Sequence, residues 1–261
     1  MLDVNHITVE YNNVPTLIDF NLHMDKGEII SLVGESGSGQ TTVIRAILGL
    51  LPQEGSVAEG DILFEGRSLL GYSEKQMNEI RGTDICMIFQ DSGAMINPIR
   101  RIGSQFEEYI LLHEKISRKE AHQKAVRMLE AMRLPDGENI MRSYPFQLSG
   151  GMRQRVGIAM AMTFQPKLLL ADEPTSALDV TTQAQIVRQM VELNHEFDTS
   201  VIIVTHNLGV AAYMSHRILV MQNGRVVEEG GREQILQEPS CEYTKKLLQA
   251  IPVMDGELYV E

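Results

Sequence analysis

Residues 28–41 read Glu-Ile-Ile-Ser-Leu-Val-Gly-Glu-Ser-Gly-Ser-Gly-Gln-Thr, and they carry the clearest indication of the fold in this chain. Residues 28–33 form a dense apolar run, which predicts a buried strand of a parallel sheet. Apolar residues at helical spacing follow over 41–51, up to Pro52. A strand, a glycine-rich loop and a helix in this order are the context that a phosphate-binding loop requires. The stretch therefore predicts an α/β fold with an anion site after its first buried strand.

The loop over 34–41 suits phosphate binding because its glycines let backbone N–H groups point inward at phosphate oxygens. The helix that follows adds its positive N-terminus, and Thr41 offers a hydroxyl to Mg²⁺. Position 40 departs from the pattern, since Gln40 stands where such loops carry lysine. Loss of this charge-assisted contact weakens binding by about 1.5–3 kcal/mol. Hydrolysis can suffer more, because charge builds on the γ-phosphate oxygens in the transition state.

A second motif, Leu-Leu-Leu-Ala-Asp-Glu, occupies residues 168–173. An apolar strand there carries two carboxylates at its C-terminal end, where ligands bind in parallel sheets. Asp172 suits a contact with Mg²⁺ and its water, and Glu173 suits polarising an attacking water as a general base. The alternative, a pair that only caps the next turn, stays open on this motif alone.

A third motif, Leu-Ser-Gly-Gly-Met-Arg-Gln-Arg, occupies residues 148–155. It predicts the start of a helix with Ser149 as N-cap, while Gly150 and Gly151 leave N–H groups bare. A helix start of this kind is by itself a weak indication of an anion site. The three motifs in this order indicate an ATP-driven motor that works as a dimer.

The composition is that of a soluble globular protein with an acidic balance. The chain has 261 residues, 43% of them hydrophobic, and a net charge of −12. No run approaches the roughly 18–20 apolar residues of a membrane span, and the N-terminus lacks the regions of a secretion signal. The negative charge argues against a nucleic-acid partner. The two cysteines and seven histidines show no metal-ligand spacing, and we interpret Cys86 as a small buried hydrophobe.

The remaining patterns alternate between strand and helix. Strand patterns cover residues 4–11, 17–23, 61–64, 85–89, 167–172, 200–205, 217–221 and 225–228. Helical patterns cover 181–197, 207–215 and 234–250, and capping boxes begin at Ser73 and Ser117. Strand patterning disappears from about 91 to 150, which predicts a helical insert. We expect one unit over 1–261, with an α/β core and β subdomain over 1–90 and 151–240, the insert over 91–150 and a helical tail over 241–261.

Taken together, these motifs resemble the nucleotide-binding subunit of an ATP-binding-cassette (ABC) transporter over nearly the whole chain. Gln90 resembles the Q-loop glutamine, residues 176–179 resemble the D-loop, His206 resembles the switch histidine, and Tyr11 resembles the aromatic that stacks on adenine. The resemblance implies a phosphate-loop NTPase core of the RecA type, with an N-terminal antiparallel β subdomain and the inserted helical subdomain. Gln40 is the one departure.

The resemblance also implies a role for each of these residues. Glu173, His206 and Gln90 would be catalytic, and Thr41, Gln90 and Asp172 would bind Mg²⁺. The residues implied in ATP binding are Tyr11, Gly34, Glu35, Ser36, Gly37, Ser38, Gly39, Gln40, Thr41, Thr42, Ser149, Gly150, Gly151, Gln154 and Asp179. Two subunits would sandwich two ATP molecules head to tail, so that the Ser149 turn of one subunit caps the γ-phosphate on its partner's loop.

Three stretches resemble the branch of peptide and nickel importers: residues 89–98, 144–155 and 239–252. The chain stops soon after the last of these and lacks the cysteine-bearing extension of longer peptide importers, which leans the expectation toward nickel or metallophore subunits. In this branch two different ATPase subunits pair beneath two transmembrane permeases, and an extracytoplasmic protein delivers the substrate. The expected location is peripheral, at the cytoplasmic face of the cell membrane.

Three functions are compatible with these patterns. The chain is an active importer ATPase, or it is an ATP-binding regulatory subunit in which Gln40 slows turnover while a partner hydrolyses. The third is a soluble ABC ATPase of DNA repair or translation, which the acidic balance and the importer-like tail disfavour.

Overall fold

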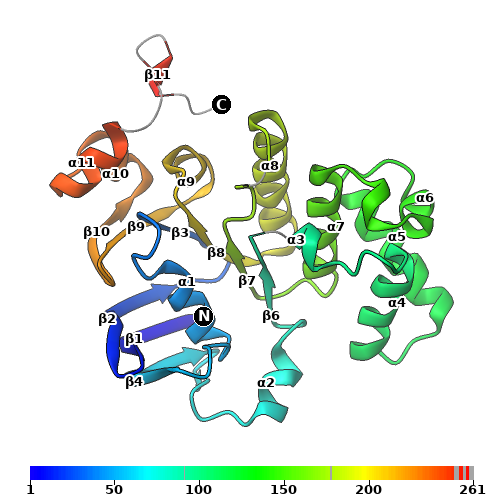
Figure 1. Cartoon of the computed structure of the whole chain (residues 1–261), viewed down its shortest axis with the longest axis horizontal. Helices are drawn as coiled ribbons and strands as arrows, with labels where there is room; N and C mark the ends of the chain where they lie inside the picture. The colour runs from blue at the N-terminus through cyan, green and yellow to red at the C-terminus, as the bar shows by residue number, and fades with distance from the viewer. Residues whose placement is uncertain (91, 177, 250–252, 255–256, 259–261) are drawn as a thin grey trace.

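A computed structural model describes residues 1–90, 92–176, 178–249, 253–254 and 257–258. In this part of the chain a six-stranded sheet forms the centre (Figure 1). Its strands follow the order β10 (Arg225–Gly231), β9 (Arg217–Gln222), β3 (Ile29–Val33), β8 (Ser200–Thr205), β7 (Leu168–Asp172) and β6 (Ile85–Ile88). All neighbouring pairs are parallel except β10 with β9. The expected α/β fold with a parallel sheet is confirmed.

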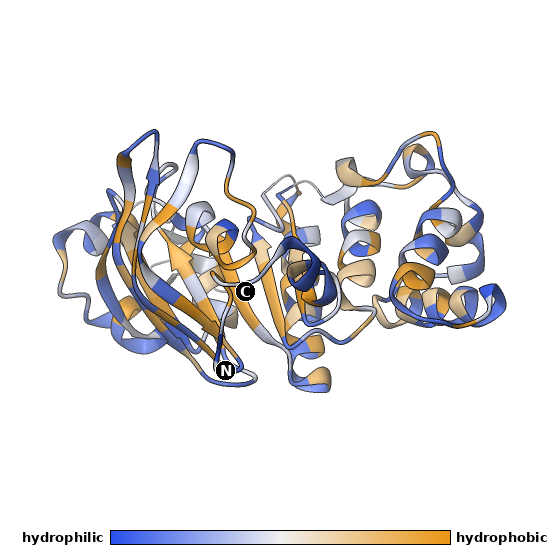
Figure 2. Ribbon diagram, turned by 90° about the horizontal axis from the view of Figure 1, so that it is seen from below, coloured by the Kyte–Doolittle hydropathy of each residue, from blue (hydrophilic) through white to orange (hydrophobic). Residues whose placement is uncertain are grey.

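Burial on both faces explains why the sequence of strand β3 is almost entirely apolar. All five of its residues are buried. Ile29 belongs to a hydrophobic cluster on one face of the sheet, and Ile30 and Leu32 belong to a different cluster on the other face. A strand covered on both faces has no side that favours polar residues. Figure 2 shows hydrophobic residues concentrated on such interior strands.

A second, antiparallel sheet covers one side of the core, as expected for the N-terminal β subdomain. Its order is β2 (Val14–Met24), β1 (Leu2–Tyr11), β4 (Gly55–Phe64) and β5 (Arg67–Ser68). Helix α1 (Gln40–Ile47) shares one hydrophobic cluster with β1, β2 and β4 and with the facing side of the central sheet. The helix that follows the phosphate loop is therefore packed between two sheets.

The helix expected over 41–51 was predicted too long. Its last helical residue is Ile47, and Gly49 adopts φ +61°. The N–H of Leu50 bonds to the carbonyl of Arg45, and the N–H of Gly49 bonds to that of Ala46. This pair of bonds is the Schellman ending, which needs a left-handed residue and commonly uses glycine. The helix thus ends at this glycine and does not run on toward Pro52.

Residues 91–150 are helical in the described part, as expected. The segment holds α3 (Ser92–Met95), α4 (Ile102–His113), α5 (Arg118–Ala131), α6 (Gly137–Arg142) and η1 (Pro145–Gln147). Both expected capping boxes are present, at Ser117 before α5 and at Ser73 before α2 (Glu74–Ile80). Figure 1 shows α4, α5 and α6 at one end of the molecule, away from the antiparallel sheet. Their buried side chains join the same cluster as α7 (Gly150–Met162).

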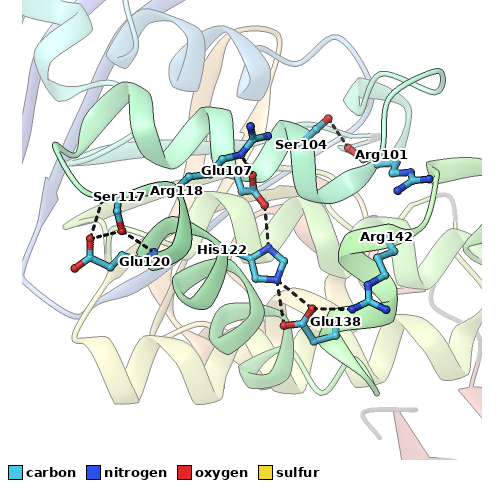
Figure 3. A network of polar contacts seen from close by, with 9 residues as sticks. All are labelled: Arg101, Ser104, Glu107, Ser117, Arg118, Glu120, His122, Glu138 and Arg142. Atoms are coloured by element: carbon cyan, nitrogen blue, oxygen red, sulfur yellow. Dashed lines mark hydrogen bonds and ion pairs between the residues drawn. The ribbon is translucent and has the colours of Figure 1, made fainter.

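A polar network ties α4, α5 and α6 together (Figure 3). His122 lies between two carboxylates: its Nδ1 is 2.9 Å from Glu107 and its Nε2 is 3.1 Å from Glu138. Arg118 Nε donates to the second oxygen of Glu107 at 2.7 Å, and Arg142 lies 3.9 Å from Glu138. The three helices are therefore linked by charge as well as by packing.

The last third of the chain matches the expected alternation up to β10. Helices α8 (Val180–Phe197) and α9 (Leu208–Met214) alternate with the strands. The single helix expected over 234–250 was wrong, because the structure has α10 (Arg232–Gln237) and α11 (Glu242–Gln249) instead. Pro239 lies between them, and a proline inside a helix removes a hydrogen bond and clashes with the preceding turn.

Some expectations fall on residues outside the described part. These are Asp91 in the segment 89–98, Ala177 in the D-loop, and residues 250–252, 255–256 and 259–261 of the tail. The tail over 241–261 was expected to be helical, but in its described residues only α11 is a helix, and β11 (Val253–Met254) pairs with β12 (Glu257–Leu258). Cys86 is a small buried residue, as expected, and its burial raises the pKa of the thiol to about 12. In the described residues, no helix combines the length and the hydropathy that crossing a membrane requires.

Candidate active site

A cavity of about 670 Å³ opens at the carboxyl ends of β3, β7 and β8. This edge is where ligands bind in open parallel sheets. Its lining residues are Gly34, Glu35, Ser36, Gly37, Gln40, Thr41, Gln90, Asp172, Glu173, Ser176, Val204 and His206. The structure thus brings the glycine loop, the acidic motif, Gln90 and His206 to one place.

The glycine loop needs its glycines for backbone reasons. Gly37 and Gly39 have φ of +86° and +103°, values that residues other than glycine adopt only with strain. At Gly34 a Cβ atom would meet the carbonyl oxygen of Met221. Gly39 is the N-cap of α1 and supplies no side-chain cap, so the first N–H groups of that helix stay open to an anion.

Gln40 is turned into the loop. The residue is 6% exposed, and its Oε1 accepts a hydrogen bond from Ser38 Oγ at 2.7 Å. The same hydroxyl lies 2.8 Å from the carbonyl oxygen of Glu35. Because one hydroxyl has one hydrogen, the two acceptors compete for it. The amide therefore takes part in the internal bonding of the loop.

Asp172 and Thr41 form the part of the cavity that suits a cation. Thr41 Oγ1 donates to Asp172 Oδ1 at 3.1 Å. Burial and the neighbouring charge of Glu173 raise the pKa of Asp172, although the Thr41 hydrogen bond lowers it. A half-buried carboxylate beside a hydroxyl offers the oxygen ligands that Mg²⁺ prefers. The described residues contain no group of three or more His, Cys, Asp and Glu that could hold a metal, so a magnesium ion here would also need ligands from a substrate or water.

Glu173 contacts one residue from each of two other expected motifs, Gln90 and His206. Its Oε2 accepts from Gln90 Nε2 at 3.3 Å, and its Oε1 lies 3.0 Å from His206 Nδ1. Its backbone adopts φ +44°, a left-handed conformation that is uncommon outside glycine, and its N–H bonds to Val204 O at 2.9 Å. Backbone strain of this kind concentrates at functional sites. The conformation aims the carboxylate into the cavity, where it could activate a water.

The residues of the Ser-Gly-Gly motif lie outside this cavity. Ser149 accepts a hydrogen bond from Met152 N–H at 3.2 Å and so caps α7 as expected. Ser149 and Gly150 are exposed, and Gly151 packs near Thr182 of α8. Gln154 is buried and donates to Pro174 O at 2.6 Å.

The remaining expected ligand residues serve local structure, and none of them lines the cavity. Asp179 caps α8 by accepting from the N–H of the third residue of that helix at 3.0 Å. Tyr11 is half-buried at the end of β1, with its hydroxyl 3.5 Å from Oγ1 of Thr42, a buried residue of α1. Ser38 and Gly39 belong to the loop's internal bonding and to the start of α1.

The cavity is also lined by Ser176 and Val204, which were not expected from the sequence. Ser176 Oγ donates to the backbone carbonyl of Glu173 at 3.2 Å, and Val204 accepts from the backbone of Glu173. Ser176 opens the expected D-loop, so its position in that motif was an available signal. Val204 acts through its backbone, and a side-chain pattern carries no signal for that.

Comparison with known proteins gives concordant matches. A family model described as ABC transporter matches residues 17–176. The oligopeptide transport ATP-binding protein OppD of Bacillus subtilis (strain 168) is 44% identical over 261 residues, which cover 98% of this chain and 73% of that protein. The dipeptide transport ATP-binding protein DppD of Lactococcus lactis subsp. cremoris (strain MG1363) is 39% identical over 99% of this chain and 75% of its own length.

A solved structure agrees with these relatives. The dimeric, post-hydrolysis state of the ATP-binding cassette MJ0796, bound to ADP and Pi, matches with a TM-score of 0.78 and 28% identity. The match covers 89% of this chain and 99% of that one. This chain belongs to the ABC transporter family, as one of its ATPase subunits.

Proposed function

We propose that this chain is the ATP-binding and ATP-hydrolysing subunit of an importer for peptides. The observation that carries the proposal is the cavity in which the loop over 34–41, Gln90, Asp172, Glu173 and His206 meet. The names of the relatives, oligopeptide and dipeptide transport ATP-binding proteins, favour peptides as the cargo. Nickel or a metal chelate remains the second candidate cargo, on the sequence resemblance alone.

In this proposal the triphosphate of ATP lies on the glycine loop and the open N-terminus of α1. Thr41, Asp172 and Gln90 would hold Mg²⁺, which supplies positive charge to the phosphates. Support comes from the 3.1 Å contact between Thr41 and Asp172, which places a hydroxyl and a carboxylate side by side in the cavity. Tyr11 would stack on the adenine.

Glu173 would act as the general base that polarises the attacking water. Gln90 and His206 contact its two oxygens and so restrict where the carboxylate points. His206 would contact the γ-phosphate when ATP is bound. Binding would then exchange the Glu173–His206 contact for one to the ligand.

A second cassette would complete the site. Ser149 and Gly150 are exposed and lie outside the chain's own cavity, so their expected phosphate is the one bound to a partner. Ser149, Gly150, Gly151, Gln154 and Asp179 would face that partner across a head-to-tail interface. The dimeric, nucleotide-bound state of the MJ0796 cassette supports this arrangement.

The complete importer would contain this chain, a second and different ATPase subunit, two transmembrane permeases and an extracytoplasmic binding protein. The ATPase subunits would sit peripherally at the cytoplasmic face of the membrane. The division into a core over 1–90 and 151–240, a signature subdomain over 91–150 and a tail over 241–261 is part of the same proposal.

Gln40 favours a second candidate function: an ATP-binding regulatory subunit beside an active partner. The observation in its favour is the buried amide, whose Oε1 is engaged with Ser38. Backbone N–H groups would still bind ATP and close the dimer, while hydrolysis would lack the lysine charge.

The test is reconstitution of the complex in vesicles with its permeases and binding protein. ATP hydrolysis and uptake of a labelled tripeptide or of Ni²⁺ are measured in parallel, with ADP as the control nucleotide. The proposal expects ATP-dependent peptide uptake. ATP-dependent uptake of Ni²⁺ and not of the tripeptide would show that the cargo is nickel. The importer function would be contradicted if the chain did not co-purify with permeases and the vesicles showed no ATP-dependent uptake.

A further inference from the structure

The phosphate loop is contacted by a residue from the far end of the chain. The backbone N–H of Glu35 donates a hydrogen bond to the hydroxyl of Tyr243, with N and O 3.1 Å apart. Tyr243 lies on α11, 208 residues along the sequence. Glu35 lines the cavity, and its carbonyl accepts from Ser38 N–H at 3.1 Å. The hydroxyl of Tyr243 is thus bonded to the residue that holds the turn of the loop.

A buried carboxylate fixes α11 in this place. Glu228 on β10 is 7% exposed. Its Oε1 accepts from the N–H of Ser240 at 2.6 Å and from the hydroxyl at 2.7 Å, and its Oε2 accepts from Cys241 N–H at 3.2 Å. Burial alone would raise the pKa of Glu228, but the hydroxyl and N–H donors around it lower the pKa below its ordinary value. The charged side chain therefore anchors the start of α11 to the central sheet.

The apolar side of α11 packs against a small hydrophobic cluster at the edge of the central sheet. Tyr243, Leu247 and Leu248 contact a small cluster that includes Val33, the residue directly before Gly34. Figure 1 shows α11 beside α10 and β10 at the edge of the core. The tail helix is therefore held by charge at its start and by packing along its apolar side, which includes Tyr243.

We propose that Tyr243 is a positioning residue for the phosphate loop, which raises nucleotide affinity by holding the Glu35 N–H from the side of the tail. A loop that is already fixed loses less conformational freedom when a ligand binds. The inference rests on the proposed function, in which this loop binds ATP. The tail helix would thus contribute to nucleotide binding through Tyr243, a residue that lies outside the three nucleotide motifs.

The test is Tyr243→Phe, which keeps the ring and removes only the hydroxyl. The dissociation constant for Mg-ATP, measured by calorimetry, is expected to rise about two- to tenfold, the range for one neutral hydrogen bond. The rate at saturating ATP stays unchanged, and the Glu35 amide exchanges faster with solvent. Tyr213→Phe is the matched control, since Tyr213 lies on α9 beside a different cavity, and it leaves all three quantities unchanged.

Failure of this inference is separable from failure of the proposed function. If the wild-type chain does not bind ATP, the proposed function is overturned, and this inference with it. If the wild type binds and Tyr243→Phe has the same dissociation constant, only the inference is overturned, including when the variant merely unfolds at a lower temperature. Glu228→Gln is expected to weaken binding as well, and by less than additively in combination with Tyr243→Phe. Full additivity would overturn the anchoring role of Glu228.

Discussion

Glu173 Oε1 lies 3.0 Å from Nδ1 of His206, although 33 residues separate the two in sequence. The carboxylate comes from the end of β7 and the histidine follows the end of β8, and these strands are parallel neighbours in the sheet. The contact therefore follows from the strand order. It joins the proposed general base to the residue expected to contact the γ-phosphate, so loss of either side chain should alter turnover more than ATP binding.

Glu173→Gln should abolish most hydrolysis while ATP binding is retained. The amide cannot accept a proton, and a general base contributes about 10²–10⁴-fold to rate. ATPase activity of the complex is the measurement, made in the wild-type and Gln40→Lys backgrounds. Glu196→Gln, an exposed change on α8, is the control. A Glu173→Gln rate within about twofold of the parent would contradict the assigned role.

Gln40→Lys should raise both ATP affinity and turnover. The restored ammonium regains about 1.5–3 kcal/mol of charge-assisted contact, which is roughly 10- to 150-fold in affinity. The change also removes one of the two acceptors of the Ser38 hydroxyl and leaves Glu35 O, at 2.8 Å, as the other. Ser38→Ala separates this second effect. An unchanged ATPase rate in Gln40→Lys would show that the missing lysine charge does not limit turnover.

Ser149→Asp should block ATP-dependent dimer formation without weakening ATP binding to the single chain. Asp keeps the N-cap of α7 but adds a negative charge where the partner's γ-phosphate is expected. Light scattering with and without Mg-ATP reports the dimer, and calorimetry reports binding by the isolated chain. Ser117→Asp makes the same change at the N-cap of α5 and serves as the control. Normal ATP-driven dimerisation of Ser149→Asp would refute the shared site.

The His122 network should make the stability of the helical region depend on pH. The hydrogen bond to Glu107 holds the pKa of His122 above its ordinary value, against the effect of burial. The protonated form is thus favoured in the folded state, and its contribution is complete below a pH of about 6.5 and lost as pH rises through the folded pKa.

The measurement is the melting temperature of the wild type and of His122→Gln across that range. We expect the wild-type advantage to be greatest at acidic pH and to shrink by at most about 3 °C, because partly exposed ion pairs are weak. His195→Gln, an exposed change on α8, should show no such trend. A gap that is constant with pH would contradict the role of the His122 charge. This charge faces Glu107 and Glu138, and the same carboxylates also contact Arg118 and Arg142 (Figure 3).

Local patterns were sufficient for most of the elements. The apolar run before Gly34, the capping boxes at Ser73 and Ser117, and the N-cap at Ser149 depend on residues within a few positions, and the structure has each of them. Strand β4 begins at Gly55 and not at Asp61, and two further errors concern helices. Gly49 ends α1 through a Schellman turn, and Pro239 separates α10 from α11, although apolar spacing continued through both points.

The amino-acid sequence alone determined the order of strand, loop and helix, the phosphate-loop chemistry and the departure at Gln40, because each is written in adjacent residues. Only the tertiary structure decided which of the candidate residues share a cavity. Glu173 meets Gln90 across 83 residues, Glu35 meets Tyr243 across 208, and Ser149 lies outside its own chain's cavity. Such relationships depend on how strands and helices pack. The residues adjacent to a position in the sequence do not indicate which distant residues it will contact.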